Sequence, residues 1–214
     1  MPPLSAAKTT AEAGMLDVAT LVPDIALEMR YAGEDNFVGQ RIDGYHAPRC
    51  YLLAPVAQAL AEVERSLRSQ GLRLKLYDCY RPVRAVRHFV EWAADPTDQR
   101  AKARYYPHID KADLLGDYIA PVSGHSRGAT VDLGLMRCDE GGACVDLDMG
   151  TGYDYFDQRA HTDAPSLTVE QKGNRRRLVE AMERGGFRNY PLEWWHYSHA
   201  REPVPGQLYD APVR

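Results

Sequence analysis

The stretch between residues 55 and 78 constrains the fold most, because two different hydrophobic periods follow each other there without a gap. Residues 55–71 begin with a proline, end on a glycine and space their apolar side chains by four, three and four residues, at Val56, Leu60, Val63 and Leu67. This pattern is typical of an amphipathic helix with proline at its entry. Residues 72–78 then alternate leucines with Arg73, Lys75 and Tyr77, which predicts a half-buried strand.

The same two periods recur along the rest of the chain. Further helices are predicted over residues 82–95 and 168–186, and further strands over residues 129–135, over residues 144–150 and around residues 193–196. The strands at 129–135 and 144–150 are expected to form a hairpin. Helices that lie early and between strands, together with late strands joined by hairpins, predict an α+β class with a mixed or antiparallel sheet flanked by helices.

The chain length indicates one compact domain. A domain of 214 residues buries about 70% of the surface of its unfolded chain, and a second full domain does not fit. No internal repeat or linker-like stretch interrupts it. Residues 1–15 are small and polar and lack the apolar core of a secretory signal, so we expect a flexible N-terminal arm, with the domain covering residues 16–214.

Charge excludes several classes of partner. The formal net charge is −4 and the isoelectric point is about 6.0, which disfavours nucleic acid and anionic membranes as partners. Residues 175–177 are three arginines in a predicted helix, where a solvated face is a better interpretation than a phosphate site. No apolar run reaches the roughly 18 residues that a membrane-spanning helix needs. No pattern indicates an oligomeric state.

Four cysteines bear on the cellular compartment. Cys50, Cys79, Cys138 and Cys144 are few for a disulfide scaffold and lack the C-x-x-C spacing of a structural zinc site. Cys138 and Cys144 flank a turn-like insert, so a disulfide across a hairpin and two free thiols are both open at this point. A disulfide would favour an oxidising compartment. A native Met1 predicts a cytoplasmic protein, and a removed signal peptide would allow a periplasmic one.

Two imidazoles and a carboxylate suggest a metal site. His125 lies in a loop rich in glycine and serine, Asp132 follows on the polar face of a strand, and His196 stands in the sequence LEWWHY. This is the three-ligand set of a catalytic zinc ion whose fourth position is left to water. Glu193 would then be the nearby acid that is not a ligand. Because residues three apart on a flat strand face opposite ways, this assignment requires a bulge or twist near Trp194. An ordinary packed core is the alternative interpretation.

Arg81 is a second candidate for chemistry. It stands in the sequence YDCYRP, where a predicted strand ends and a helix begins, and its guanidinium could stabilise a developing oxyanion. The alternative is an ordinary helix-entry arginine paired with a surface acid. A serine nucleophile at Ser126 is disfavoured, because the chain has no G-x-S-x-G elbow.

Four motifs, RYAGEDNFVGQRIDGY, YDCYRP, SGHSRGATVDL and EWWHY, occur in this order. With them the chain resembles the D-alanyl-D-alanine dipeptidases of the VanX type, zinc D,D-dipeptidases of peptidase family M15, from about Leu16 to the C-terminus. The resemblance implies a zinc hydrolase that cleaves the free cell-wall precursor D-Ala-D-Ala, an activity associated with vancomycin resistance or with the catabolism of wall fragments. It assigns His125, Asp132 and His196 to one zinc ion, makes Glu193 the general base, and has Arg81 polarise the scissile carbonyl. It further implies that Tyr31, Ser123 and Asp154 hold the dipeptide, with Tyr45 near the same pocket.

Two other functions remain open from the sequence. A D-alanyl-D-alanine carboxypeptidase shares such a zinc site but trims a longer peptidoglycan stem. A binding module stabilised by zinc, without turnover, is the alternative from another class.

Overall fold

A computed structural model describes residues 2–214 of the chain. Its centre is a mixed sheet with the strand order β2-β4-β5-β8-β7, formed by Ala26–Leu27, Leu72–Asp78, Thr130–Cys138, Glu193–His199 and Phe187–Tyr190. A short strand, β6 (Cys144–Asp146), pairs with β5. Only the β2–β4 pair is parallel, and the other pairs in this sheet are antiparallel. A separate two-stranded sheet joins β1 (Met15–Asp17) to β3 (Tyr51–Leu53). The predicted α+β class with a mixed sheet is confirmed.

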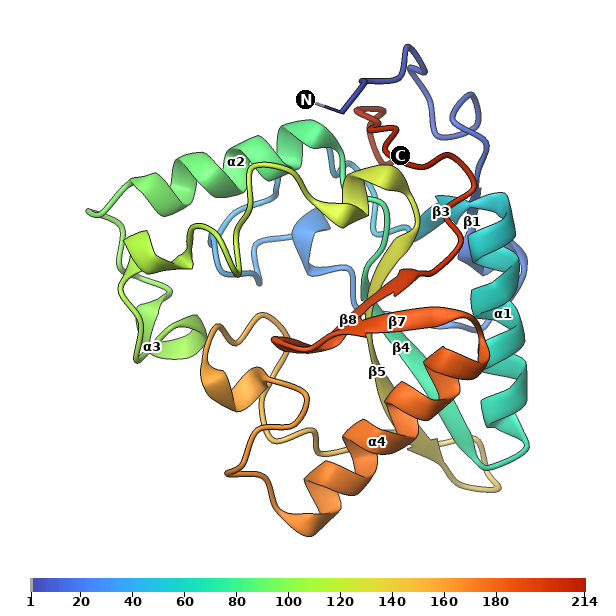
Figure 1. Cartoon of the computed structure of the whole chain (residues 1–214). Coiled ribbons are helices and arrows are strands. Elements are labelled where there is room, and N and C mark those ends of the chain that lie inside the picture. Colours follow the sequence, from blue (N-terminus) through green and yellow to red (C-terminus); the bar gives the residue numbers. More distant parts are fainter. Residues whose placement is uncertain (1) are drawn as a thin grey trace.

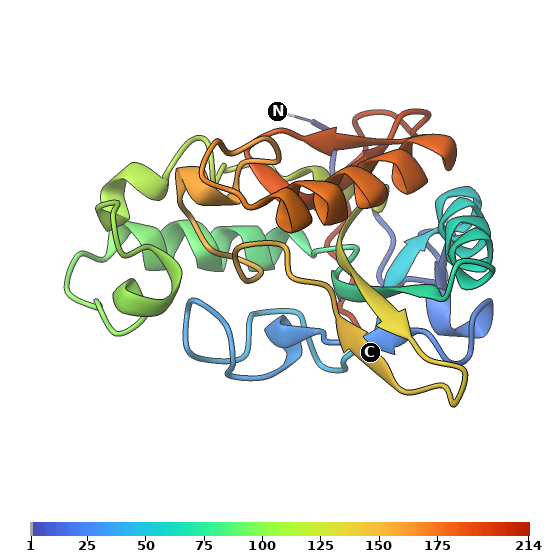
Figure 2. The ribbon, with the colours of Figure 1, turned by 90° about the horizontal axis from the view of Figure 1, so that it is seen from below.

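Two long helices, α1 (Ala54–Arg68) and α4 (Val169–Arg184), contact each other and the sheet (Figure 1). The predicted helices at 55–71 and 168–186 correspond to them, and α2 (Val83–Ala94) corresponds to the one at 82–95. A fourth, short helix is α3 (Lys102–Tyr105). Figure 2 shows long connecting segments and α2 gathered on the side of the sheet away from α1. Val86 and Phe89 of α2 and parts of the connecting segment 116–124 line the cavity that contains the catalytic candidates.

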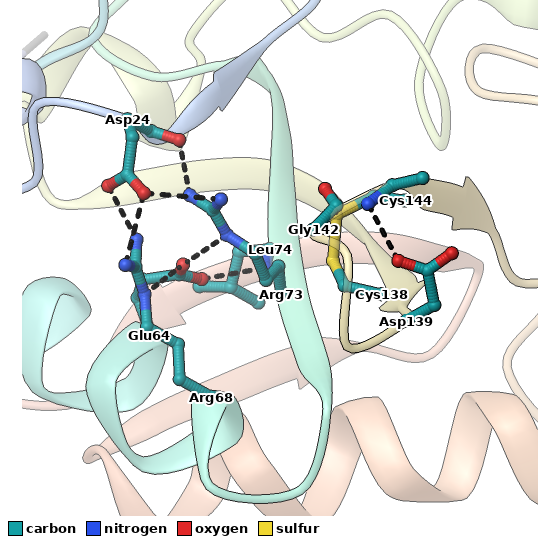
Figure 3. Close-up of a disulfide and its surroundings, with 10 residues drawn as sticks. Asp24, Glu64, Arg68, Arg73, Leu74, Cys138, Asp139, Gly142 and Cys144 are labelled. Atoms are coloured by element: carbon teal, nitrogen blue, oxygen red, sulfur yellow. Dashed lines mark hydrogen bonds and ion pairs between the residues drawn. A yellow bond between two sulfur atoms is a disulfide. The ribbon is translucent and has the colours of Figure 1, made fainter.

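An ion network fixes α1 to β4. The side chain of Glu64 is fully buried, and its carboxylate accepts hydrogen bonds from Arg68 Nε at 3.0 Å, Arg73 Nε at 3.1 Å and the backbone N–H of Leu74 at 2.7 Å (Figure 3). Asp24 pairs with both arginines from the other side. A buried carboxylate costs little when its lone pairs are satisfied in this way, so the helix and the strand are held in one register.

One sequence expectation differs from the structure. Arg175 is buried rather than solvated, and its guanidinium donates to the backbone oxygens of Met149, Arg159 and His161, so it holds the segment before α4 against that helix. The segment expected to be a loose arm lies against the C-terminal end of the chain, where the N–H of Ser5 donates to the oxygen of Leu208 at 2.8 Å.

Among residues 2–214, none of the helices is both long and apolar enough to cross a membrane.

All four cysteines are paired in disulfides, one more bond than we considered from the sequence. Cys138 and Cys144 lie opposite each other where β5 pairs with β6, at the tip of the predicted hairpin (Figure 3). Cys50 and Cys79 are both fully buried and join the segment before β3 to the segment after β4. Their spacing in sequence contains no sign of this contact, because only the tertiary fold brings the two segments together.

The two disulfides are expected to differ in their contribution to stability. The Cys50–Cys79 bond closes a separation of 29 residues and the Cys138–Cys144 bond one of 6. In the chain-entropy account, replacing the first pair by alanine should lower the free energy of unfolding by about 3–4 kcal/mol, and replacing the second by about 2 kcal/mol. Urea unfolding of the two double variants measures this difference. A larger loss from the hairpin pair would contradict it.

Candidate metal centre and active-site cavity

Three side chains from two strands and one loop converge on a single point. Asp132 lies on β5 directly opposite His196 on β8, and His125 lies in the short 3-10 helix Gly124–Arg127 just before β5. Asp132 Oδ1 is 3.2 Å from His125 Nε2 and 3.1 Å from His196 Nδ1, and the two nitrogens are 3.3 Å apart. In a tetrahedral site with bonds of about 2.0–2.1 Å, neighbouring ligand atoms are about 3.3 Å apart. The triangle therefore has the size that one zinc ion requires.

The state of the donor atoms supports a metal rather than a hydrogen-bonded core. Asp132 Oδ1 is buried and has no hydrogen-bond partner within residues 2–214, although two ring nitrogens lie close to it. His125 Nδ1 is 2.7 Å from the backbone oxygen of Cys79, which fixes the proton on Nδ1 and leaves the lone pair of Nε2 facing Asp132. A buried oxygen without a donor, next to such a lone pair, fits a cation. These residues fit the zinc site predicted from the sequence.

A bulge in β8 brings Glu193 to the same side as His196. Tyr190 of β7 pairs with Glu193 and Asn189 pairs with Tyr197, so the three residues of β8 between these two pairs have no partner on β7. The side-chain amide of Asn189 spans the bulge by donating to the backbone oxygens of Glu193 and His196, both at 3.0 Å. The carboxylate of Glu193 consequently lies 3.3 Å from His196 Nδ1. The irregularity that the spacing of these residues demanded is confirmed.

A second bulge brings an unpredicted residue into the site. Leu76 of β4 pairs with Leu133 but Asp78 pairs with Asp132, so Tyr77 is the extra residue and Asp78 lies directly across from the metal-site aspartate. Asp78 is fully buried and accepts hydrogen bonds from Arg81 Nε at 2.9 Å and from the hydroxyl of Tyr45 at 2.6 Å. Burial raises the pKa of Asp78, and the charge of Arg81 opposes that rise.

Arg81 is directed toward the cavity by its neighbours. Its guanidinium lies over the rings of Phe89 and Tyr31, and one terminal nitrogen is 3.5 Å from Asp132 Oδ2. Although burial opposes its charge, the neighbouring carboxylate of Asp78 raises the pKa of Arg81 well above its usual range. The guanidinium therefore stays protonated and is held in one orientation beside the metal site.

The substrate-binding candidates fall into two groups. Tyr31, Ser123 and Asp154 line a cavity of about 270 Å³ together with Arg81, Glu193 and the three metal candidates. Tyr45 does not line this cavity and lies behind it, where it supports Asp78. The resemblance implied that Tyr45 lies near the substrate pocket. In the structure Tyr45 contacts Asp78 behind the cavity and does not form part of the cavity wall.

Asp154 has an unusual environment for a carboxylate. Its backbone is left-handed, with a φ of 59°, and its side chain is 4% exposed. Within residues 2–214 its oxygens receive hydrogen bonds only from the hydroxyl of Tyr31, at 3.0 and 3.1 Å. Burial raises the pKa of Asp154 well above its usual range. A cation that entered the cavity would stabilise the ionised form.

Several residues near the site were not identified from the sequence. Tyr153 stands next to Asp154 and contacts both Tyr31 and Asp132, and Asn189 and Asp78 act through the two bulges. Asp78 stood within a motif that we identified only for its arginine. Bulges are not visible in hydrophobic periodicity, so the contacts that they create cannot be derived from it.

A mixed sheet whose inner strands bring two imidazoles and a carboxylate together, beside a free acid and a fixed guanidinium, defines a candidate metal-dependent hydrolase. Comparison with known proteins specifies the class. A family model described as D-ala-D-ala dipeptidase, Peptidase_M15, matches residues 11–214. The chain belongs to this family of metallopeptidases.

Relatives of similar length support the assignment. A D-alanyl-D-alanine dipeptidase of Enterococcus faecium is 39% identical over 204 residues, covering 95% of this chain and 100% of the relative. One of Streptomyces coelicolor is 41% identical over 197 residues, covering 92% of this chain and 96% of the relative. Among solved structures, a zinc complex of the vancomycin resistance D,D-pentapeptidase VanY is 19% identical with a TM-score of 0.43, covering 83% of this chain and 80% of that one.

Proposed function

We propose that the protein is a zinc-dependent D,D-dipeptidase that hydrolyses free D-Ala-D-Ala to two D-alanines, with one zinc ion per chain. The observation that carries the proposal is the buried Asp132 Oδ1, which lacks a hydrogen bond and lies 3.1 and 3.2 Å from two imidazole nitrogens. His125, Asp132 and His196 would hold the ion. When bound, zinc supplies Lewis acidity that polarises a carbonyl and lowers the pKa of water.

Glu193 is suited to move the protons of the reaction. Its carboxylate is largely buried and lies beside the metal candidates without joining their triangle. In the proposed reaction it takes a proton from the attacking water. It then gives this proton to the amine that leaves when the peptide bond breaks.

Arg81 is suited to stabilise the oxygen that gains charge. Its guanidinium is fixed by Asp78 before substrate arrives, so no reorganisation is needed when the tetrahedral intermediate forms. We therefore expect Arg81→Ala to lower kcat by about 10²- to 10³-fold while the zinc content is unchanged. Steady-state kinetics and metal analysis measure the two quantities, with Arg87→Ala, an exposed site on α2, as the control. An unchanged kcat would reduce Arg81 to a structural residue.

Charge balance favours a substrate with a free ammonium group. Four carboxylates, of Asp78, Asp132, Asp154 and Glu193, lie at or directly behind the cavity with one guanidinium, that of Arg81. Their formal charge of −3 would be balanced by a zinc dication and one ammonium. Among the described residues the oxygens of Asp154 accept only from Tyr31, and Asp154, unlike Glu193, has no contact with the candidate ligand His196, so we assign the ammonium to Asp154.

The substrate class is tested with three matched peptides. Zinc-replete protein should hydrolyse D-Ala-D-Ala and should be far slower on N-acetyl-D-Ala-D-Ala, which has no ammonium, and on L-Ala-L-Ala. Equal or faster cleavage of the acetylated peptide would favour a carboxypeptidase. Zinc-loaded protein inert on all three would favour a binding module and would overturn the proposal.

A further inference from the structure

Tyr153 lies between the candidate metal centre and the candidate ammonium site. Its side chain is 3% exposed, and its hydroxyl is 3.1 Å from Asp132 Oδ2 and 2.9 Å from the hydroxyl of Tyr31. Tyr31 in turn contacts Asp154. Two phenols therefore connect the carboxylate of the metal site to the carboxylate of the cavity.

The ring of Tyr153 is held rigidly in this position. It stacks on the ring of Tyr77 at 4.7 Å with an interplanar angle of 12°, and meets the edge of Trp195 at 5.6 Å. The left-handed backbone of the next residue, Asp154, lets two consecutive side chains reach the site. With the ring fixed, the only remaining freedom is rotation of the hydroxyl hydrogen of Tyr153 from one acceptor to the other.

The number of donors and acceptors around Tyr153 shows how the metal centre and the ammonium site would be coupled. Tyr153 has one hydroxyl hydrogen and two acceptors, and the charged Asp132 is the stronger of them. Tyr31 gives its one hydrogen to Asp154, so its oxygen accepts from Tyr153 in competition with Asp132. The donation from Tyr31 to Asp154 makes the oxygen of Tyr31 a stronger acceptor, because hydrogen bonds in a chain polarise one another, and this draws the hydrogen of Tyr153 away from Asp132.

We propose that Tyr153 is a positioning residue that holds Asp132 Oδ2, leaves Oδ1 for the metal, and joins the metal centre through Tyr31 to the ammonium site at Asp154. The part of this proposal that concerns Asp154 rests on the proposed function. The effect on metal affinity does not, because it needs no substrate. Partners of metal ligands in proteins typically change metal affinity or activity by 10- to 100-fold when they are removed.

The test measures zinc affinity by chelator competition for four proteins: the unchanged chain, Tyr153→Phe, Tyr31→Phe and the double variant. Tyr77→Phe is the matched control, since it removes a hydroxyl from the ring stacked on Tyr153. Phenylalanine keeps each ring, and thermal unfolding of the zinc-free proteins verifies that the fold is retained. Kinetics on D-Ala-D-Ala at saturating zinc are measured in parallel.

Tyr153→Phe should weaken zinc binding by about 10-fold or more, and Tyr77→Phe should leave it unchanged. Tyr31→Phe should not weaken it, because this variant removes the acceptor that competes with Asp132 for the hydrogen of Tyr153. The double variant should match Tyr153→Phe alone, because Tyr31 acts through Tyr153. Unchanged affinity in Tyr153→Phe, or an equal loss in Tyr77→Phe, would overturn the role of Tyr153. Additive losses in the double variant would overturn the link through Tyr31.

The two proposals fail in different ways. If the unchanged protein binds zinc tightly but cleaves none of the peptides, the proposed function fails, while the affinities still decide the role of Tyr153. If it cleaves D-Ala-D-Ala and Tyr153→Phe keeps full zinc affinity, only the inference about Tyr153 fails. If it binds no zinc, both fail.

Discussion

Replacing Glu193 by glutamine is expected to lower kcat on D-Ala-D-Ala by about 10²- to 10⁴-fold, the usual contribution of a general acid-base group, without loss of zinc. Glutamine keeps the size of the side chain but cannot accept a proton at neutral pH. The carboxylate lies near His196 but outside the triangle of candidate ligands, so the metal should remain bound. Timed assays of D-alanine formation measure kcat, and metal quantification on the same sample measures the zinc content.

The control for this variant is Glu180→Gln, at an exposed position on α4. It should match the unchanged protein in both measurements. Loss of zinc together with activity in Glu193→Gln would show that Glu193 is a ligand and would contradict the assigned roles. Retention of full kcat would remove it from the reaction altogether.

The second large effect is expected from the metal centre itself. Replacing His125 by alanine removes one of three protein ligands and should weaken zinc binding by at least about 100-fold. Dividing a zinc binding free energy of about 10–16 kcal/mol among four ligands leaves roughly 3 kcal/mol for each. Activity should fall with zinc occupancy and should return in part at high zinc concentration.

His46→Ala is the matched control, because this imidazole is exposed and is not one of the three candidate ligands. Chelator competition measures the affinity of each variant, and unfolding curves check that the cavity left by His125 has not disrupted the fold. Zinc affinity that is unchanged in His125→Ala would remove this residue from the site.

Much of the fold followed from hydrophobic periodicity, but the details of the site did not. The helix and strand between residues 54 and 78 appear where two clean periods predicted them. The metal candidates could be identified because imidazoles and carboxylates in polar positions of strands and loops are few. Asp132 was predicted as a ligand on the polar face of a strand, and that side chain is buried and contacts Tyr153.

The contacts missed from the sequence share a physical cause. The Cys50–Cys79 disulfide, the pairing of Asp78 with Arg81 and the amide of Asn189 across the β8 bulge all depend on tertiary register. Hydrophobic periodicity reports which face of an element is buried, and a one-residue bulge changes that face without changing the composition. Only the requirement that Glu193 and His196 share a target indicated one of the two bulges.

The most direct test of the account is X-ray absorption spectroscopy at the zinc edge on the loaded protein. If His125, Asp132 and His196 hold one ion, the spectrum should show two imidazole nitrogens and a carboxylate oxygen at about 2.0–2.2 Å from the zinc. It should also show one further light-atom ligand and no sulfur. The imidazole signal should fall in His125→Ala. A first shell containing sulfur, or one without imidazole, would contradict the account.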